Sequence, residues 1–280
     1  MSYSTLVDAP TLARHLNDPT WRIVDVRHQL ADVNFGENAY AAGHLPGAVF
    51  LHCDRDLSGP TTGRNGRHPL PDPARLAARF GEIGIGPQTQ VVVYDDAQGM
   101  VAGRLWWLLR WLGHDRVAVL DGGLQAWQAA GGELVRDIAQ PVPVSFVARP
   151  CDALVDVDHV RAFLQTSRMH LIDARSADRF RGENETIDPV GGHIPGAVNR
   201  FFRDNLQADG RFKPAAALRN EWLALLAGQA PEQVVHHCGS GISACHNILA
   251  MELAGLPGSR LYPGSWSEWC ADPQRPVAVG

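Results

Sequence analysis

The segment that begins at Cys238 carries the strongest signal for covalent chemistry in the sequence. It reads Cys-Gly-Ser-Gly-Ile-Ser-Ala over residues 238–244, follows an apolar run that ends at Val235, and precedes a helical pattern that begins about Ser243. A strand, a glycine-containing turn and a helix start place backbone N–H groups around one sulfur atom. Such surroundings favour the thiolate, the form in which cysteine acts as a nucleophile.

Two glycines shape this loop. Gly239 and Gly241 let the backbone curl closely around the sulfur, because glycine adopts positive φ without steric cost. The amides of residues 239–244 can then hold a negatively charged sulfur much as an oxyanion hole holds an oxyanion. The commoner fate of a cysteine is burial as a small hydrophobic residue. The position at a strand-to-helix loop favours the catalytic interpretation for Cys238.

Composition and charge narrow the classes of partner. Hydrophobic residues make up 45% of the chain, the formal net charge is −5, and no basic cluster interleaved with aromatic residues occurs. No run approaches the ~18 apolar residues of a membrane span, and no leader pattern is present at the N-terminus. We therefore expect a cytoplasmic protein that binds neither nucleic acid nor a membrane. Neither a disulfide framework nor a structural zinc site is predicted, because the cysteines are odd in number and lack C-x-x-C spacing: Cys53, Cys151, Cys238, Cys245 and Cys270.

The two halves of the chain form an internal sequence repeat. Residues 23–27 return as residues 171–175, and Gly-His-Leu-Pro-Gly-Ala at 43–48 returns as Gly-His-Ile-Pro-Gly-Ala at 192–197. In the later part of each half the offset is 142, at which Cys238 corresponds to Asp96. The first half thus keeps the loop and lacks the nucleophile. We expect one catalytic domain and one inactive copy.

Each half alternates short β-branched runs with longer helical patterns, which predicts an α/β fold of two tandem domains, each a mainly parallel sheet flanked by helices. A proline-rich stretch separates the halves, so we expect an inactive domain at 1–140, a linker at 141–150 and a catalytic domain at 151–280. Strands are predicted near 22–26, 90–94, 117–120, 169–173, 233–237 and 260–262, and helices at 74–83, 101–112, 124–130, 214–226 and 243–254.

These motifs resemble the tandem-domain rhodanese family. The resemblance rests on the paired Gly-His-x-Pro-Gly-Ala segments, the Cys238 loop and the Gly-Ser-Trp-Ser-Glu-Trp segment at 264–269, and it extends from Ile23 to Trp269. The loop is similar to that of 3-mercaptopyruvate sulfurtransferases, whereas thiosulfate sulfurtransferases typically have a basic loop. Ile242 and Ser243 stand where valine and threonine are usual, a change that keeps the hydroxyl group.

The resemblance implies a ping-pong sulfur transfer. Cys238 would take sulfur from a small donor, 3-mercaptopyruvate or thiosulfate, hold it as a persulfide, and pass it to thioredoxin, glutathione or cyanide. No metal or organic cofactor is implied. The substrate-binding positions would be Gly239, Gly241, Ile242, Ser243 and Arg181, the last matching the family's substrate-binding arginine. A guanidinium grips a carboxylate in a bidentate way, and we favour this role for Arg181 and a solvated surface role for Arg179.

A proton relay is a further implication. Ser240 matches a serine that is proposed, in 3-mercaptopyruvate sulfurtransferases, to act with a histidine and an aspartate of the first domain. His44 matches that histidine, and Asp32 is only approximately placed as the aspartate. His44 and His193 occupy equivalent places in the two repeats, which equally favours a structural role at a turn. His236 and His237 precede Cys238 on adjacent strand positions, so at most one of them faces the loop.

The same residues bear on three other functions. A thiosulfate:cyanide sulfurtransferase is the nearest alternative. Dual-specificity phosphatases share the fold but need an arginine six positions after the cysteine, where this chain has Ala244. A noncatalytic rhodanese-like interaction module typically lacks the cysteine that is present here as Cys238.

Overall fold

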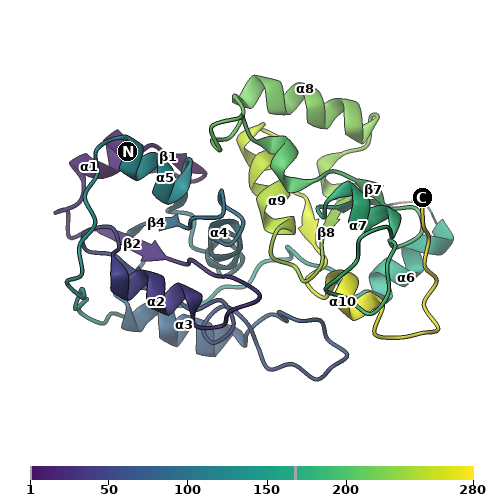
Figure 1. Cartoon of the computed structure of the whole chain (residues 1–280), viewed down its shortest axis with the longest axis horizontal. Coiled ribbons are helices and arrows are strands. Elements are labelled where there is room, and N and C mark those ends of the chain that lie inside the picture. The colour runs from purple at the N-terminus through teal and green to yellow at the C-terminus, as the bar shows by residue number, and fades with distance from the viewer. Residues whose placement is uncertain (1, 167–168) are drawn as a thin grey trace. The chain divides into compact units, whose positions relative to one another are not determined.

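The computed structural model describes residues 2–166 and 169–280, and it divides into two compact units (Figure 1). The first unit comprises Met1–Gly59, Leu70–Cys151 and Asp209–Arg211. The second comprises Pro60–Pro69, Asp152–Ala208 and Phe212–Gly280. The sequence suggests a single boundary within residues 141–150. The structure instead assigns ten residues of the first half, Pro60–Pro69, to the second unit.

The first unit contains a five-stranded parallel sheet in the order β1-β5-β4-β2-β3. Its strands are β1 (Leu6–Val7), β2 (Trp21–Asp25), β3 (Val49–Phe50), β4 (Gln90–Tyr94) and β5 (Val117–Leu120). Its helices are α1 (Ala9–Arg14), α2 (Phe35–Ala42), α3 (Pro73–Glu82), α4 (Ala102–Trp111) and α5 (Gly123–Ala129). Residues of β4 are buried throughout, as expected of a central strand with helices on both faces.

The second unit contains a four-stranded parallel sheet in the order β7-β6-β8-β9. Its strands are β6 (His170–Asp173), β7 (Val198–Asn199), β8 (Val234–His237) and β9 (Arg260–Leu261). Its helices are α6 (Val157–Thr166), α7 (Ala177–Arg181), α8 (Ala215–Leu226), α9 (Ala244–Leu253) and α10 (Ser265–Trp269), with 3-10 turns η1 (Phe202–Asn205) and η2 (Pro231–Gln233).

The predicted α/β class with two parallel sheets is confirmed. The predicted strands and helices end within two residues of the observed ones. The sequence analysis did not predict helices α1, α2, α6 and α7. Helices α1, α2 and α7 have six, eight and five residues, too few for a clear periodic pattern. Shortness does not explain the omission of α6, which has ten residues.

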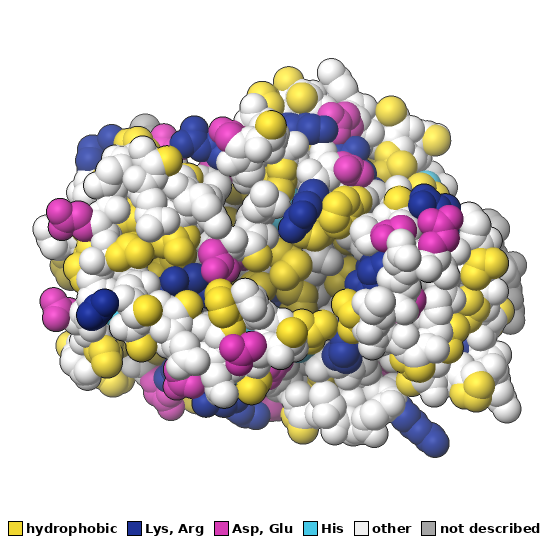
Figure 2. Space-filling view, viewed as in Figure 1, with side chains coloured by type: hydrophobic (Ala, Val, Ile, Leu, Met, Phe, Trp, Pro, Cys, Tyr) yellow, Lys and Arg dark blue, Asp and Glu magenta, His cyan; other side chains and the backbone are white. Residues whose placement is uncertain are grey.

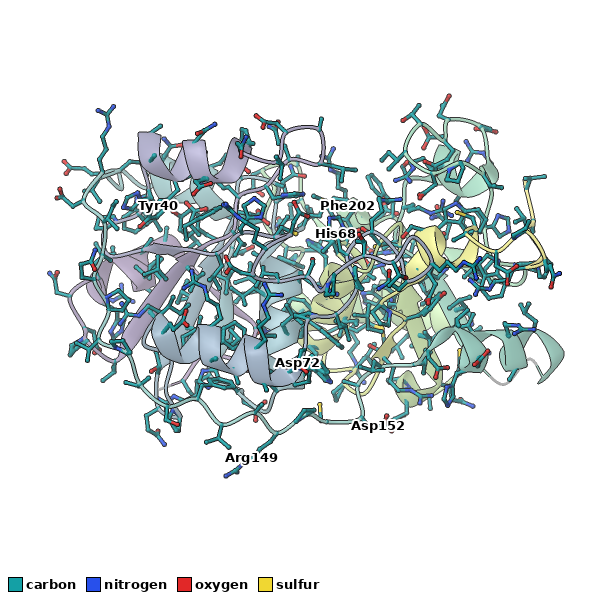
Figure 3. All side chains as sticks on the ribbon, turned by 90° about the horizontal axis from the view of Figure 1, so that it is seen from below. Tyr40, His68, Asp72, Arg149, Asp152 and Phe202 are labelled. Atoms are coloured by element: carbon teal, nitrogen blue, oxygen red, sulfur yellow. The ribbon has the colours of Figure 1, made fainter. Side chains whose placement is uncertain are left out.

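Local signals explain where helices begin. Asp72 precedes Pro73 at the start of α3 (Figure 3), and its carboxylate accepts hydrogen bonds from the amides of Ala74 and Arg75 at 3.0 and 2.9 Å. Proline fits the first helical position, where its missing N–H would have no partner, and an aspartate cap satisfies two of the free amides. The helix then lays Leu76 and Phe80, both fully buried, against the sheet.

An ion pair recurs at the same place in both units and ties a strand to the repeated turn. In the first unit Arg27 donates to Asp25 at 2.6 Å and to the carbonyl oxygen of Gly43 at 2.8 Å. In the second unit Arg175 donates to Asp173 at 2.7 Å and to the carbonyl of Gly192 at 2.7 Å. In both units, the arginine of the Asp-x-Arg motif therefore links the end of a strand to the glycine of the Gly-His motif by hydrogen bonds.

The surface shows no sorting by charge on the face drawn in Figure 2, where acidic and basic side chains are interspersed. Among the described residues, no helix combines the length and apolarity needed to cross a bilayer.

Candidate functional site

Cys238 lies directly after β8, at the carboxyl end of a central strand of the second sheet. Its side chain is 2% exposed, and the amide of Gly241 donates to its Sγ atom at 3.1 Å. Gly241 has φ of +77°, and a Cβ atom there would lie 2.5 Å from the carbonyl oxygen of Pro263, so glycine is required by conformation and by space. The loop therefore presents an amide to the sulfur, an arrangement that stabilises a negative charge on it.

The first residues of helix α10 form hydrogen bonds with the backbone of the Cys238 loop. The amide of Cys238 donates to Oγ of Ser265 at 3.1 Å, and its carbonyl accepts from the amide of Trp266 at 2.9 Å. The amide of Ser267 donates to the carbonyl of Gly239 at 2.9 Å. At the other end of the loop, Ile242 is buried. These bonds fix the backbone on both sides of Cys238, and the amide of Gly241 donates to its sulfur.

The two histidines before the cysteine point to opposite faces of the sheet. His236 packs edge-on against Trp222, with ring centroids 5.7 Å apart, and its Nε2 lies 3.2 Å from the sulfur of Met251. Burial lowers its pKa to about 3, so the ring is neutral at neutral pH. His237 lies 3.8 Å from Asp173, on the neighbouring strand. Both side chains serve the packing of the sheet.

Ser240 has a histidine partner that the sequence did not indicate. Nδ1 of His68 lies 2.8 Å from Oγ of Ser240, and both side chains are buried. His68 belongs to Pro60–Pro69, the segment of the first half that is part of the second unit. A buried hydroxyl and imidazole at this distance can exchange a proton.

Two guanidinium groups lie over Gly239. A Cβ atom placed on Gly239 would be 2.9 Å from Nη2 of Arg67 and 3.7 Å from Nη2 of Arg179. The amide of Arg67 donates to Oγ of Ser267 at 3.1 Å, which anchors the Pro60–Pro69 segment at the start of α10. The loop itself contains no basic residue, but this unit supplies two cations to it. A charge pattern read along the sequence cannot detect that.

Two buried carboxylates balance those cations. Asp188 pairs with Arg67 and with Arg179, the latter at 3.2 Å, and Glu185 pairs with Arg179 at 2.9 Å. Burial raises the pKa of Asp188, and Arg67 and Arg179 oppose that rise. Burial also acts to raise the pKa of Glu185, but two backbone amides and Arg179 outweigh it and hold this pKa below its usual value. The four side chains carry no net charge when all are ionised.

The structure does not bring Arg181 to the loop. Its side chain is 43% exposed and pairs with Glu183 at 2.7 Å on the surface of the unit. Arg179 lies one residue before Phe180 and two before Arg181, so it points to a different side of the short helix α7. We therefore correct the sequence-based choice and assign the proposed carboxylate-binding role to Arg179.

His44 has a structural environment within the first unit. Its ring stacks on Tyr40 with centroids 3.8 Å apart, and its two nitrogens lie 2.7 and 3.1 Å from the carbonyl oxygens of Tyr40 and Asp137. His193 stacks on Phe180 in the same way in the second unit, at 3.7 Å. Because both repeats use the histidine to brace a turn, we move the proposed proton-relay role from His44 to His68.

In the first unit, the loop after β4 directs its backbone amides at the side chain of Asp95. Asp95 is fully buried after β4, and its carboxylate accepts four backbone hydrogen bonds of 2.8 to 2.9 Å, from Ala97, Gly99, Val101 and Ala102. Gly99 is the equivalent of Gly241, whose amide donates to the cysteine sulfur in the other unit. The same amide thus serves a built-in carboxylate in one copy and a thiol in the other.

We expect Asp95→Asn to lower the free energy of unfolding by about 3 kcal/mol, because the new amide group would face N–H donors it cannot satisfy. Chemical denaturation followed by circular dichroism measures this change. Asp96→Asn is the matched control, since the amides of Ala97, Gly99, Val101 and Ala102 donate to the Asp95 carboxylate and not to that of Asp96. Equal stability of the two variants would mean that the four hydrogen bonds to the Asp95 carboxylate do not stabilise the fold.

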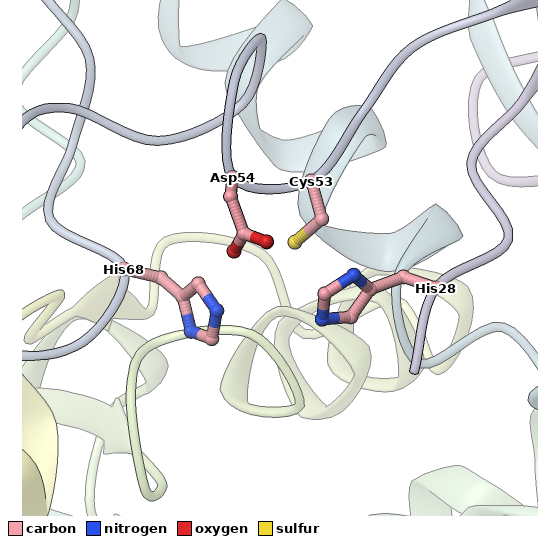
Figure 4. A group of neighbouring side chains, drawn as sticks. All are labelled: His28, Cys53, Asp54 and His68. Atoms are coloured by element: carbon pink, nitrogen blue, oxygen red, sulfur yellow. The ribbon is translucent and has the colours of Figure 1, made fainter. Parts of the chain in front are cut away.

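Three further side chains of the first unit come together near the ends of its strands (Figure 4). The nearest ligand-type atoms of His28, Cys53 and Asp54 lie within 4.8 Å of one another. Burial raises the pKa of the Cys53 thiol to about 12, with the Asp54 charge adding to the effect. The thiol therefore keeps its proton at neutral pH and is a poor nucleophile.

Sequence reasoning indicated Cys238 as the candidate nucleophile but missed the residues that lie around its loop. His68, Arg67 and Asp188 lie far from Cys238 in the sequence, and the first two come from the other half of the repeat. The one local signal was the Arg-His-Pro sequence at 67–69, which stands where the chain is rich in glycine and polar residues. An arginine and a histidine in a stretch of this composition are ordinarily exposed to solvent.

The fold and the site together define a tandem α/β protein in which the loop after a central parallel strand holds a buried cysteine in one unit and a buried carboxylate in the other. Residues 8–130 and 156–272 both match the model of the rhodanese-like domain. The chain belongs to this family, and it is a sulfurtransferase of the tandem-domain type.

Relatives cover the whole chain. The sequence is 48% identical to a probable 3-mercaptopyruvate sulfurtransferase of Pseudomonas aeruginosa over 100% of both chains. It is 40% identical to a putative thiosulfate sulfurtransferase of Mycobacterium tuberculosis, over 98% of this chain and 97% of the relative. The solved structure of a 3-mercaptopyruvate sulfurtransferase from Leishmania major superposes with a TM-score of 0.83 at 31% identity, covering 95% of this chain and 74% of that one.

Proposed function

We propose that the protein transfers sulfur from 3-mercaptopyruvate, through a persulfide on Cys238, to a thiol acceptor or cyanide. The observation that carries the proposal is the buried Cys238 sulfur, which accepts a hydrogen bond from the Gly241 amide in a loop where two guanidinium groups lie beside Gly239. The relatives named for 3-mercaptopyruvate support this donor.

The transfer balances without a cofactor. The Cys238 thiolate attacks the donor sulfur, the S–S bond forms, and the C–S bond of the donor breaks. The electron pair of that bond passes to the carbon, which leaves as the enolate of pyruvate. The thiol proton of the donor is released as its sulfur becomes the outer persulfide atom, and the enolate takes up one proton to give pyruvate. The persulfide keeps the negative charge that the thiolate brought.

Ser240 and His68 are suited to carry that proton. Oγ of Ser240 lies 2.8 Å from Nδ1 of His68, within the range for proton transfer. Ser240 would accept the proton from the donor thiol as His68 accepts the serine proton, and the reverse movement would deliver it to the enolate. Because the pair is buried, water competes poorly for the proton.

Arg179 is the proposed anchor for the donor carboxylate. Its guanidinium lies beside Gly239, the residue after Cys238, and a guanidinium binds a carboxylate with two parallel hydrogen bonds. A single carboxylate matches the near-neutral charge of the surrounding Arg67, Arg179, Glu185 and Asp188 group better than a dianion does.

Thiosulfate is the second candidate donor. The observation that favours it is the presence of two cationic side chains at Gly239, which the loop sequence alone does not show. A relative named as a putative thiosulfate sulfurtransferase agrees with this alternative.

For the acceptor we propose thioredoxin or glutathione, with cyanide as a laboratory acceptor. We also place the protein in the cytoplasm, because its five cysteines are free thiols. We expect steady-state assays with the two donors, side by side and with one acceptor, to give the higher kcat/KM for 3-mercaptopyruvate. A higher value for thiosulfate would overturn the donor assignment and leave the sulfur transfer intact.

A further inference from the structure

Asp188 holds both cationic side chains of the site. One carboxylate oxygen pairs with Nη1 of Arg67 and the other accepts from Nη2 of Arg179 at 3.2 Å, while the Asp188 side chain is 2% exposed. Those two guanidinium groups are the ones that lie over Gly239. The buried carboxylate of Asp188 therefore takes up hydrogen-bond donors of both guanidinium groups next to the Cys238 loop.

The two arginines differ in how far they depend on Asp188. Arg179 also pairs with Glu185 in a two-bond contact, at 3.0 and 2.9 Å. Arg67 has Asp188 as its one ion-pair partner among the described residues of this unit, and its side chain is 26% exposed. An incoming anion can thus reach Arg67 from solvent, but it must compete with Asp188 for it.

We propose that Asp188 is a specificity-determining residue that selects against dianionic sulfur donors. The inference rests on the proposed sulfur transfer and concerns the choice of donor by the same site. With Asp188 ionised, the group around Gly239 offers hydrogen-bond donors without excess positive charge. A monocarboxylate gains a bidentate contact there, whereas thiosulfate would place a second negative charge close to Asp188.

Replacing the carboxylate with an amide isolates this effect. Asp188→Asn keeps the shape and one acceptor oxygen, removes the negative charge, and leaves the guanidinium groups with one uncompensated positive charge. We expect the ratio of kcat/KM for thiosulfate to that for 3-mercaptopyruvate to rise about tenfold, the effect of one charge-assisted contact. Sulfate, an unreactive dianion, should become a competitive inhibitor about tenfold tighter by the same argument.

The matched control is Glu232→Gln, which removes one negative charge from an exposed position in η2 of the same unit. Its donor ratio should equal that of the wild type, because an exposed charge away from the loop is screened by salt. If Glu232→Gln shifts the ratio as far as Asp188→Asn does, the effect is one of net charge and the proposal fails.

A second variant, Arg67→Gln, keeps the proposal testable if Asp188→Asn does not fold. Arg67→Gln removes the accessible cation, so the donor ratio should fall below that of the wild type. An unchanged or lower ratio in folded Asp188→Asn, or an unchanged or higher ratio in Arg67→Gln, would overturn the proposal. If the wild-type protein transfers sulfur from neither donor, the proposed function itself fails, and the assay separates that outcome from the loss of selectivity alone.

Discussion

Cys238→Ser should abolish sulfur loading. In the wild type, brief exposure to 3-mercaptopyruvate should raise the intact mass by one sulfur atom, and the variant should show no increase, because a serine hydroxyl cannot form the S–S bond. Turnover should fall by on the order of a thousandfold or more, as expected when a covalent nucleophile is removed. Mass spectrometry and a steady-state assay on the same samples measure both effects.

The matched control is Cys151→Ser. Cys151 is exposed, whereas the other four cysteines are buried, so it is the thiol most open to adventitious modification. This variant should load sulfur as the wild type does. Sulfur loading of Cys238→Ser, or its loss in Cys151→Ser, would remove Cys238 from its assigned role.

Arg179→Gln should lower kcat/KM for 3-mercaptopyruvate by roughly ten- to a hundredfold, the loss of a charge-assisted bidentate contact with the donor carboxylate. Most of the change should appear in KM, because the carboxylate is remote from the breaking bond. Arg179→Lys should recover part of the loss, since it restores the charge without the planar fork.

Arg181→Gln is the comparison that distinguishes the two arginines. Arg181 pairs with Glu183 at the surface, and exposed ion pairs contribute little, so we expect wild-type kinetics. Thermal unfolding of both variants separates binding from stability, because the loss of Arg179 leaves Glu185 and Asp188 with fewer partners. Normal kinetics for Arg179→Gln with a defect in Arg181→Gln would restore the sequence-based assignment.

The fold was predictable because its main signals, the internal repeat and the composition of the buried strands, can be recognised in short stretches of sequence. A buried parallel strand such as β4 appears in the sequence as a run of valines bounded by polar residues, and its counterpart β8 follows at a fixed offset. Helices with a strong apolar stripe, such as α3, could be placed as well. Helix α7 could not, because five residues give no periodic signal.

The candidate site was predictable only for residues that adjoin Cys238 in the sequence. The loop from Cys238 to Ser243 is contiguous, so its glycines and hydroxyl groups can be read together. The choice between Arg179 and Arg181 depends on which way a short helix turns, and that is fixed by the burial of Phe180 between them. His68 could not be assigned, because nothing in its own neighbourhood shows that it belongs with the second sheet.

The assignment of Pro60–Pro69 to the second unit bears on how the chain can be divided. In a simple tandem repeat, each half would be a complete folding unit that could be produced alone. Here a cut at the repeat boundary would deprive the second half of Arg67 and His68, although both halves retain their own sheets. We therefore expect residues 152–280, produced alone, to lack two side chains that the proposed chemistry at Cys238 requires, and the first half is not dispensable for that chemistry.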